Sequence, residues 1–159
     1  MHTITTFEPD FEKLLPETYA LLAAANLTVH DGVKIVVLEG SRGLQGRPRP
    51  DSDVDLSLVV DTTRLPSDEP AREEFLRAVI DTTLSQWRGP VELDTAAVFD
   101  MGHGLDLFEI REYDPAQIPD CPGGCFGLYK TQKGFNGYVP PSMIELPKIY
   151  PLLVIWRRS

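Results

Sequence analysis

Two carboxylates and a small-residue pair are the part of this sequence best suited to chemistry. Asp53 and Asp55 lie two positions apart in an apolar run, and Gly40-Ser41 precedes them along the chain. Residues i and i+2 of a strand share a face, so these carboxylates would repel each other unless a cation lay between them. Hard oxygen ligands suit Mg²⁺ or Mn²⁺, and a Gly-Ser turn can offer backbone N–H groups and a hydroxyl to phosphate oxygens. The pattern therefore predicts phosphoryl or nucleotidyl transfer.

The wider pattern around these residues resembles the DNA polymerase β-like nucleotidyltransferase superfamily, in particular its minimal single-domain members. That signature is an apolar residue, Gly followed by Gly or Ser, a spacer, and Asp-apolar-Asp-apolar. Here it reads Leu38, Gly40-Ser41 and Asp53-Val54-Asp55-Leu56. The Arg-Pro-Asp-Ser-Asp run that ends at Asp53 is also similar to aminoglycoside adenylyltransferases. The resemblance is close over residues 33–60, looser to residue 99 and absent beyond it.

This resemblance implies a two-metal, in-line transfer of a nucleoside monophosphate from a nucleoside triphosphate to an acceptor hydroxyl, with ATP as the expected donor. Asp53 and Asp55 would hold Mg²⁺ or Mn²⁺. Gly40 and Ser41 would bind the β- and γ-phosphates, and Arg42, next to the turn, would meet the triphosphate.

The implied chemistry needs a third carboxylate on a neighbouring strand, and Asp94 is the expected one. It lies within the apolar run of residues 91–99, where an uncompensated carboxylate would cost several kcal/mol. Glu92 shares its strand face and is the alternative. Both residues could instead lie on the solvent-facing side of an edge strand.

The charge of the chain limits its partners. A formal net charge of −9 argues against non-specific binding to DNA, because phosphate contacts need a basic surface. A mononucleotide needs only a local basic cluster, which Arg42, Arg47 and Arg49 would supply. The expected partners are a nucleoside triphosphate and a hydroxyl acceptor on a protein, an RNA or a small molecule, with a homodimer as one way to complete the acceptor site.

Length and composition predict one globular domain. The chain has 159 residues, of which 42% are hydrophobic and 25% charged, enough for a single buried core. No apolar stretch reaches the length of a membrane span, and residues 1–10 lack the layout of a signal peptide. We therefore expect no membrane association and a cytoplasmic location.

The hydrophobic pattern predicts an α+β fold, a small mixed β-sheet backed by helices, which is also the architecture that the resemblance implies. Helical spacing covers residues 10–26, with Asp10 as the expected N-cap and Pro16 as a kink or first turn, and residues 67–88. A short helix could follow the Gly-Ser pair to residue 46. Strands are expected at residues 34–38, 53–60, 91–99 and 105–111.

The character of the sequence changes at residue 115, where proline and glycine become dense. We expect a nucleotidyltransferase core over residues 1–114 and an irregular Pro/Gly-rich C-terminal extension over residues 115–159, packed on the same domain. Short strands are expected in the extension at residues 126–130 and 152–156 at best.

Two features of the extension have open interpretations. Cys121 and Cys125 are expected to be free thiols, although a zinc site or a redox pair would also use them. Residues 130–138 combine lysines, aromatics and glycines, a composition that suits a nucleotide or acceptor contact and equally an ordinary surface loop.

Three classes of function follow from these observations. The first is a metal-dependent nucleotidyltransferase. The second is a catalytically inactive module of the same fold that binds a nucleotide or a partner. The third is a zinc-dependent structural protein built on the cysteines.

Overall fold

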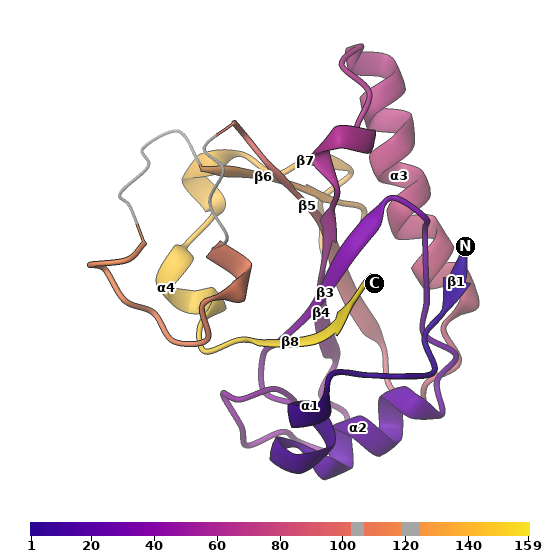
Figure 1. The fold of residues 1–159 in the computed structure, drawn as a ribbon, viewed down its shortest axis with the longest axis vertical. Coiled ribbons are helices and arrows are strands. Elements are labelled where there is room, and N and C mark those ends of the chain that lie inside the picture. The colour runs from indigo at the N-terminus through magenta and orange to yellow at the C-terminus, as the bar shows by residue number, and fades with distance from the viewer. Residues whose placement is uncertain (103–106, 119–124) are drawn as a thin grey trace.

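The computed structural model describes residues 1–102, 107–118 and 125–159, and these form a mixed α+β fold, as expected (Figure 1). A six-stranded mixed sheet has the order β7-β6-β5-β4-β3-β8, and a second sheet pairs β1 with β2. The strands are β1 (His2–Thr3), β2 (Thr28–Val29), β3 (Val33–Glu39), β4 (Val54–Val60), β5 (Leu93–Asp100), β6 (Phe126–Lys130), β7 (Gly137–Tyr138) and β8 (Leu153–Arg157). The α-helices are α1 (Pro9–Leu14), α2 (Pro16–Ala23), α3 (Glu69–Gln86) and α4 (Leu146–Ile149), with short 3₁₀ turns at Thr62–Arg64, Leu107–Glu109 and Pro141–Met143.

The centre of the main sheet is built from β3, β4, α3 and β5. β3 and β4 are antiparallel, whereas β4 and β5 are parallel neighbours joined through α3. A parallel pair needs a long crossover connection, which α3 provides by packing against β5 and β6. The remaining pairs of the sheet, β3–β8, β5–β6 and β6–β7, are antiparallel.

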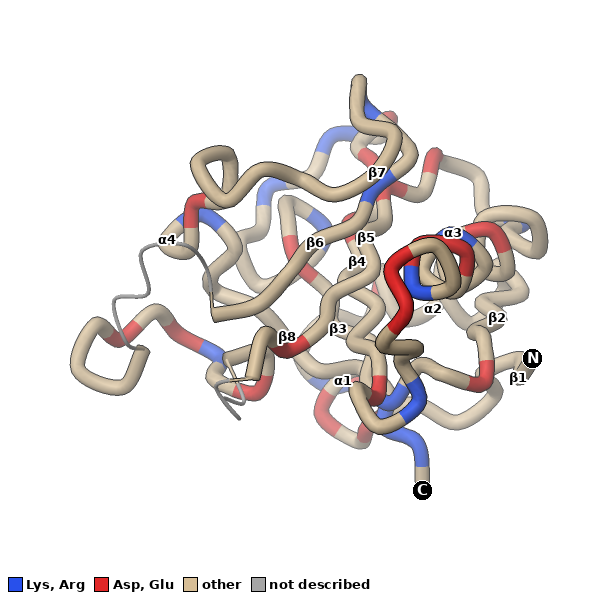
Figure 2. The backbone as a smooth tube through the Cα atoms, turned by 90° about the horizontal axis from the view of Figure 1, so that it is seen from above, with Lys and Arg blue, Asp and Glu red and all other residues tan. Residues whose placement is uncertain are grey.

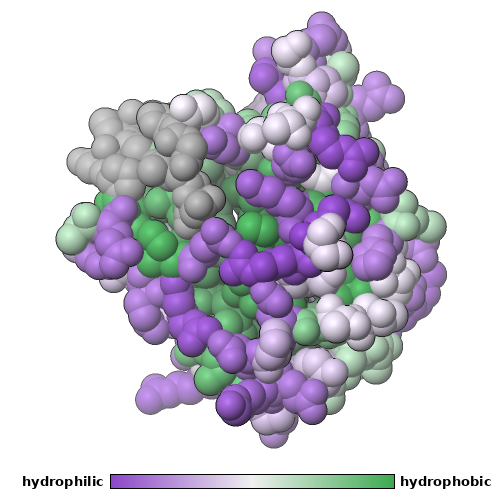
Figure 3. Space-filling model, in the orientation of Figure 1, coloured by the Kyte–Doolittle hydropathy of each residue, from purple (hydrophilic) through white to green (hydrophobic). Residues whose placement is uncertain are grey.

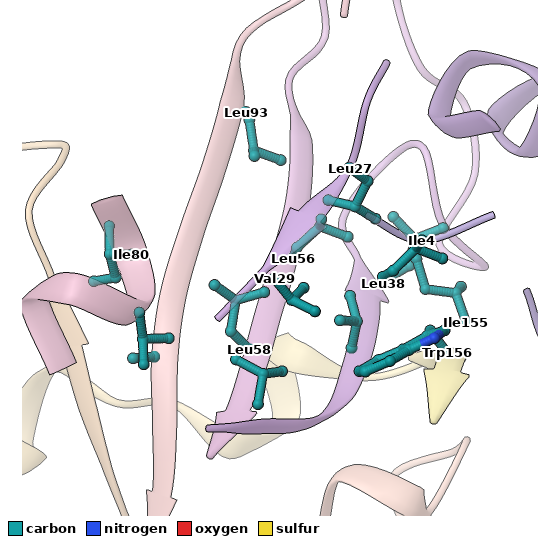
Figure 4. Packing of buried hydrophobic residues seen from close by; sticks show 14 of the residues in the cluster. Ile4, Leu27, Val29, Leu38, Leu56, Leu58, Ile80, Leu93, Ile155 and Trp156 are labelled. Atoms are coloured by element: carbon teal, nitrogen blue, oxygen red, sulfur yellow. The ribbon is translucent and has the colours of Figure 1, made fainter. Parts of the chain in front are cut away.

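Both faces of the sheet are covered, because successive residues of a strand point to opposite sides. On one face, a core cluster joins the strands to α1, α2 and α3. Figure 4 shows part of this cluster, with Ile80 of α3 and five side chains of four strands: Leu38, Leu56, Leu58, Leu93 and Ile155. On the other face, a second cluster joins Val37, Val59 and Val98 to the described part of the C-terminal third, in which Phe108 and Phe126 are among the buried members. Figure 1 shows α3 and α4 on opposite sides of the sheet.

The expected helix over residues 10–26 is divided in two. α1 ends at Leu14, and α2 begins with Pro16 in its first turn. Proline has no N–H to continue the hydrogen-bond ladder, but it is tolerated at the first helical position. The N-cap of α1 is Glu8, so the expectation that Asp10 caps the helix is wrong.

The C-terminal third is more regular than the sequence indicates. The strand expected at residues 126–130 is confirmed as β6, and the one expected at 152–156 is β8, one residue further along. Together with β7 they supply three strands of the main sheet, so residues on both sides of position 115 build one sheet. The expected strand at residues 105–111 is wrong in its described part, where residues 107–109 form a 3₁₀ turn with Leu107 and Phe108 buried. Residues 103–106 lie outside the described part.

The expectation of free thiols is wrong for Cys125, which is disulfide-bonded. Cys121 lies outside the described residues. Among the helices that the structure describes, none is long and apolar enough to cross a membrane.

Candidate functional site

Three carboxylates form a row across β3, β4 and β5, at one end of these central strands. Glu39 of β3 lies opposite Asp55 of β4, and Asp55 lies opposite Asp94 of β5. Residues that face each other on neighbouring strands have Cβ atoms about 4.5–5.5 Å apart. The alternation of each strand turns all three toward the face opposite α3. The sheet therefore brings together Asp55 and Asp94, which the sequence singles out, with Glu39, for which the sequence suggests no role.

Asp53 reaches the same region from a loop. β4 begins at Val54, so Asp53 lies one residue before the strand, and its charge adds to the rise in the pKa of Asp55. Its carboxylate Oδ2 accepts a hydrogen bond from Lys133 Nζ at 2.7 Å. Asp53 is 23% exposed and Lys133 is 53% exposed, so this ion pair lies at the rim of the site.

The choice between Asp94 and Glu92 is decided by position. Glu92 is exposed and precedes β5, where its backbone carbonyl accepts a hydrogen bond from Val54 N at 3.0 Å. Asp94 lies beside Asp55 and is only 16% exposed. Its Oδ1 accepts a hydrogen bond from Lys130 Nζ at 2.9 Å. Asp94 is thus the carboxylate that neighbours Asp55.

The row is short of positive charge. Burial and the neighbouring Asp94 raise the pKa of Asp55 to about 6. Burial also raises the pKa of Glu39 to about 7, although a hydrogen bond donated by the Ser57 hydroxyl to its carboxylate acts in the opposite direction. Two raised pKa values on adjacent strands mean that the site disfavours its own negative charges, and a cation placed there would relieve this cost.

The Gly-Ser turn passes directly against this row. Gly40 has a φ of +74°, and a Cβ added to it would lie 2.0 Å from Asp55 Oδ2. Only glycine allows this close approach. A hydrogen bond from Gly43 N to Gly40 O at 3.0 Å closes the turn. Ser41 follows in a run of turns, so the helix expected up to residue 46 is not formed.

Arg42 has a role in the structure that the sequence does not suggest. Its guanidinium donates hydrogen bonds to three carbonyl oxygens of the loop before Asp53: those of Ser52 at 2.7 Å, Pro50 at 3.1 Å and Arg49 at 3.2 Å. Arg42 thereby fixes the loop that carries Asp53. Contact between Arg42 and a triphosphate stays a prediction. The guanidinium group that would contact the phosphates already donates hydrogen bonds to these three carbonyl oxygens.

A cavity of about 280 Å³ opens beside the acidic row. Glu39, Asp55 and Asp94 line one part of it, and apolar side chains line another: Phe108, Phe126, Leu128 and Ile149. These four side chains come from the C-terminal third, which the resemblance does not cover, and Leu56 and Ala96 of the central strands add to the apolar lining. Figure 3 shows apolar surface on this side of the sheet, beside the residues drawn in grey, while the rest of the face is largely hydrophilic.

The donor atoms fit a hard divalent cation, although lysines hold two of the acids. Within the described residues, no three His, Cys, Asp or Glu side chains are gathered as a metal site. Lys130 and Lys133 pair with Asp94 and Asp53 instead, and Figure 2 shows basic and acidic positions close together around β5, β6 and β7. The oxygens of Asp53, Asp55 and Asp94 have the chemistry that Mg²⁺ or Mn²⁺ prefers, and Asp55 has no lysine partner among the described residues.

Comparison of the chain with protein-family models, with curated proteins and with solved structures finds no match.

Proposed function

We propose that this protein is a metal-dependent nucleotidyltransferase with the nucleotidyltransferase fold of the DNA polymerase β-like superfamily. It would transfer AMP from ATP to a hydroxyl acceptor. The observation that carries the proposal is the register of Asp55 with Asp94 on parallel neighbouring strands, with Gly40 turned against the Asp55 carboxylate.

The connection of the elements supports this proposal. The Gly-Ser turn lies between β3 and β4, and the crossover through α3 returns the chain so that β5 pairs with the other edge of β4 and begins at the same end. A phosphate-binding turn and two carboxylates from distant parts of the sequence thereby meet at one end of the strands. Transfer of a phosphoryl-linked group requires these two features, a site for phosphate oxygens and carboxylates that bind a metal ion.

Each residue of the proposed site has a role. Asp53, Asp55 and Asp94 would hold Mg²⁺ or Mn²⁺, which when bound neutralises triphosphate charge and stabilises the attacking and leaving oxygens. The backbone N–H groups and hydroxyl at Gly40-Ser41 would contact β- and γ-phosphate oxygens. The acceptor oxygen would form a bond to the α-phosphorus, and pyrophosphate would leave as the bond from the α-phosphorus to the oxygen bridging to the β-phosphate breaks. Asp94 would take the hydroxyl proton.

The first test is a calorimetric titration with a non-hydrolysable ATP analogue and Mg²⁺. We expect wild type to bind the analogue only with the metal, and Asp53→Asn/Asp55→Asn to bind it at least about 100-fold more weakly, since loss of even an outer partner of a metal ligand costs about 10–100-fold. Asp51→Asn is the matched control, because Asp51 belongs to the same loop and is 85% exposed. Failure of well-folded wild type to bind any triphosphate would contradict the proposal.

A second candidate function is a catalytically inactive module that binds a nucleotide or a partner. The ion pairs of Lys130 and Lys133 favour it, because they compensate two of the acids without any metal. In such a module, binding would need no divalent cation, and neutralising Asp53 and Asp55 would leave the affinity unchanged. The same titration therefore separates the two functions.

A further inference from the structure

Two lysines of one short segment are the counter-ions of the acidic site. Lys130 ends β6 and contacts Asp94, and Lys133 lies in the turn that follows and contacts Asp53. Both acids belong to the set that the proposed function assigns to the metal. The segment of residues 130–133, which we call the lysine turn, therefore occupies the carboxylates that the metal would use.

The lysine turn is held in place by a residue between the two lysines. Gln132 Nε2 donates a hydrogen bond to Leu93 O at 2.7 Å, and Gln132 Oε1 accepts one from Thr95 N at 3.0 Å. Both partners flank Asp94 on β5. The backbone of the turn is thus attached to the strand that carries the acid, and the lysine side chains can change partner without any movement of the turn.

The Lys133–Asp53 ion pair is the more exposed of the two and the more easily exchanged. Lys133 is half exposed, and an ion pair at a surface stabilises a protein by no more than about 1 kcal/mol. A divalent cation carries twice the charge of an ammonium group and would compete for the same carboxylate oxygens. An ammonium group released in this way is a compact point charge with three donors, which suits the oxygens of a phosphate.

We propose that Lys130 and Lys133 are triphosphate-binding residues. When the metal and the nucleotide bind, the two lysines release Asp94 and Asp53, which then bind the metal, and the ammonium groups bind phosphate oxygens instead. This inference rests on the proposed function. It assigns the polyphosphate tail of the nucleotide to the side of the site where β6 and β7 lie, and it gives a function to the two lysines among so many acids.

The first half of the exchange is tested with the metal alone. Binding of Mn²⁺ is followed by the loss of the electron paramagnetic resonance signal of the free ion, in wild type, Lys130→Met and Lys133→Met. Because each variant removes a competing cation, we expect Mn²⁺ to bind roughly tenfold more tightly. The matched control is Lys148→Met: Lys148 lines the same cavity, but its ammonium group pairs with the exposed Glu145 at 2.9 Å. Its Mn²⁺ affinity should equal that of wild type.

The second half is tested with Mn²⁺ and a non-hydrolysable ATP analogue in a calorimeter. We expect Lys130→Met and Lys133→Met to bind the analogue roughly tenfold more weakly than wild type at saturating Mn²⁺, and Lys133→Arg, which keeps the charge, to bind it nearly as well. Circular dichroism melting checks that each variant is folded, and the exposed Lys133 keeps the test valid if Lys130→Met is unstable.

The outcomes separate the two proposals. The inference alone would be overturned if wild type binds the analogue and the lysine variants bind both Mn²⁺ and the analogue with the affinities of wild type. Wild type that binds no analogue would overturn the proposed function and this inference with it. Tighter Mn²⁺ binding combined with weaker analogue binding, in the lysine variants only, supports both.

Discussion

At the scale of single residues, Gly40 is the position where the backbone and the acidic row depend on each other. Its φ of +74° is costly for any other residue, and an added methyl group would overlap the Asp55 carboxylate. We expect Gly40→Ala to lower the free energy of unfolding by more than about 1 kcal/mol and to reduce Mn²⁺ affinity, because Asp55 must move. Chemical denaturation and Mn²⁺ titration measure the two effects.

Gly46 provides the control for this prediction. It has a nearly equal φ of +77°, and a Cβ there would meet nothing within 4 Å. Gly46→Ala should therefore show the backbone cost without the loss of Mn²⁺ affinity. Equal Mn²⁺ affinities in the two variants would mean that the close approach of Gly40 to Asp55 has no bearing on metal binding.

Single residues also show how far the sequence could predict the site. Spacing and hydrophobic pattern identify most of the residues that the fold brings close together. These are Gly40, Ser41, Asp53 and Asp55, by their spacing, and Asp94, by the apolar run around it. The sequence suggests no role for Glu39, because its role follows from its register with Asp55. Register across strands is a long-range property, and no local pattern specifies it.

The lysine turn and Arg42 illustrate the same limit. Lys133 meets Asp53 across 80 positions of sequence, so composition could suggest a phosphate contact but not the acid that holds the lysine. Arg42 was expected to face a ligand, whereas the carbonyl oxygens of its own loop engage it. An arginine has five donors, and nearby backbone acceptors compete for them with any ligand.

At the scale of elements, α3 determines that the acids of β4 and β5 meet, because it makes the two strands parallel neighbours. Its first turn is capped by Asp68, whose Oδ2 accepts a hydrogen bond from Ala71 N at 3.1 Å. We expect Asp68→Ala to cost about 1 kcal/mol and to lower Tm by about 2–4 °C in thermal melting.

The control for the helix cap lies on the same helix. Asp81 is exposed in the middle of α3 and has none of the hydrogen bonds or ion pairs found among the described residues. Asp81→Ala should leave Tm unchanged or raise it slightly, since alanine has the higher helix propensity. A loss of stability in this variant as large as that of Asp68→Ala would show that the cap is not the cause.

Elements with strong periodicity could be predicted, and those defined by tertiary pairing could not. The apolar runs at β3, β4 and β5 and the amphipathic pattern of α3 are long enough to identify each element and its approximate bounds. The sequence of residues 105–111 alternates well enough to predict a strand, yet Leu107 and Phe108 are buried in a 3₁₀ turn against the second core. β7 has only two residues, too few for any periodic signal.

At the scale of the whole molecule, the C-terminal strand is part of the core and not an appendage. β8 pairs with β3, and Leu153, Ile155 and Trp156 are buried in the helix-side cluster. Removing three such side chains costs about 2–5 kcal/mol each, a total as large as the about 5–15 kcal/mol by which a typical domain is stable. We expect deletion of residues 153–159 to abolish cooperative unfolding in calorimetry.

Deletion of residues 1–3 is the matching control, since it also removes a strand. β1 belongs to the small sheet, and both of its residues are exposed. The shortened chain should keep a cooperative transition with a Tm only slightly below that of wild type. A folded chain after removal of β8 would mean that residues 153–159 behave as a separable extension.

The alternation of β4 between two buried faces has a consequence for how this protein can change over generations. A substitution in β4 alters one side chain, but a one-codon insertion or deletion would exchange the faces of every residue beyond it. Asp55 would then point into the hydrophobic core between the sheet and α3, and a valine or leucine would point into the cavity. Descendants of this chain can therefore diversify the cavity wall one side chain at a time, while changes of length are confined to segments such as residues 43–51, between the turn and the first acid.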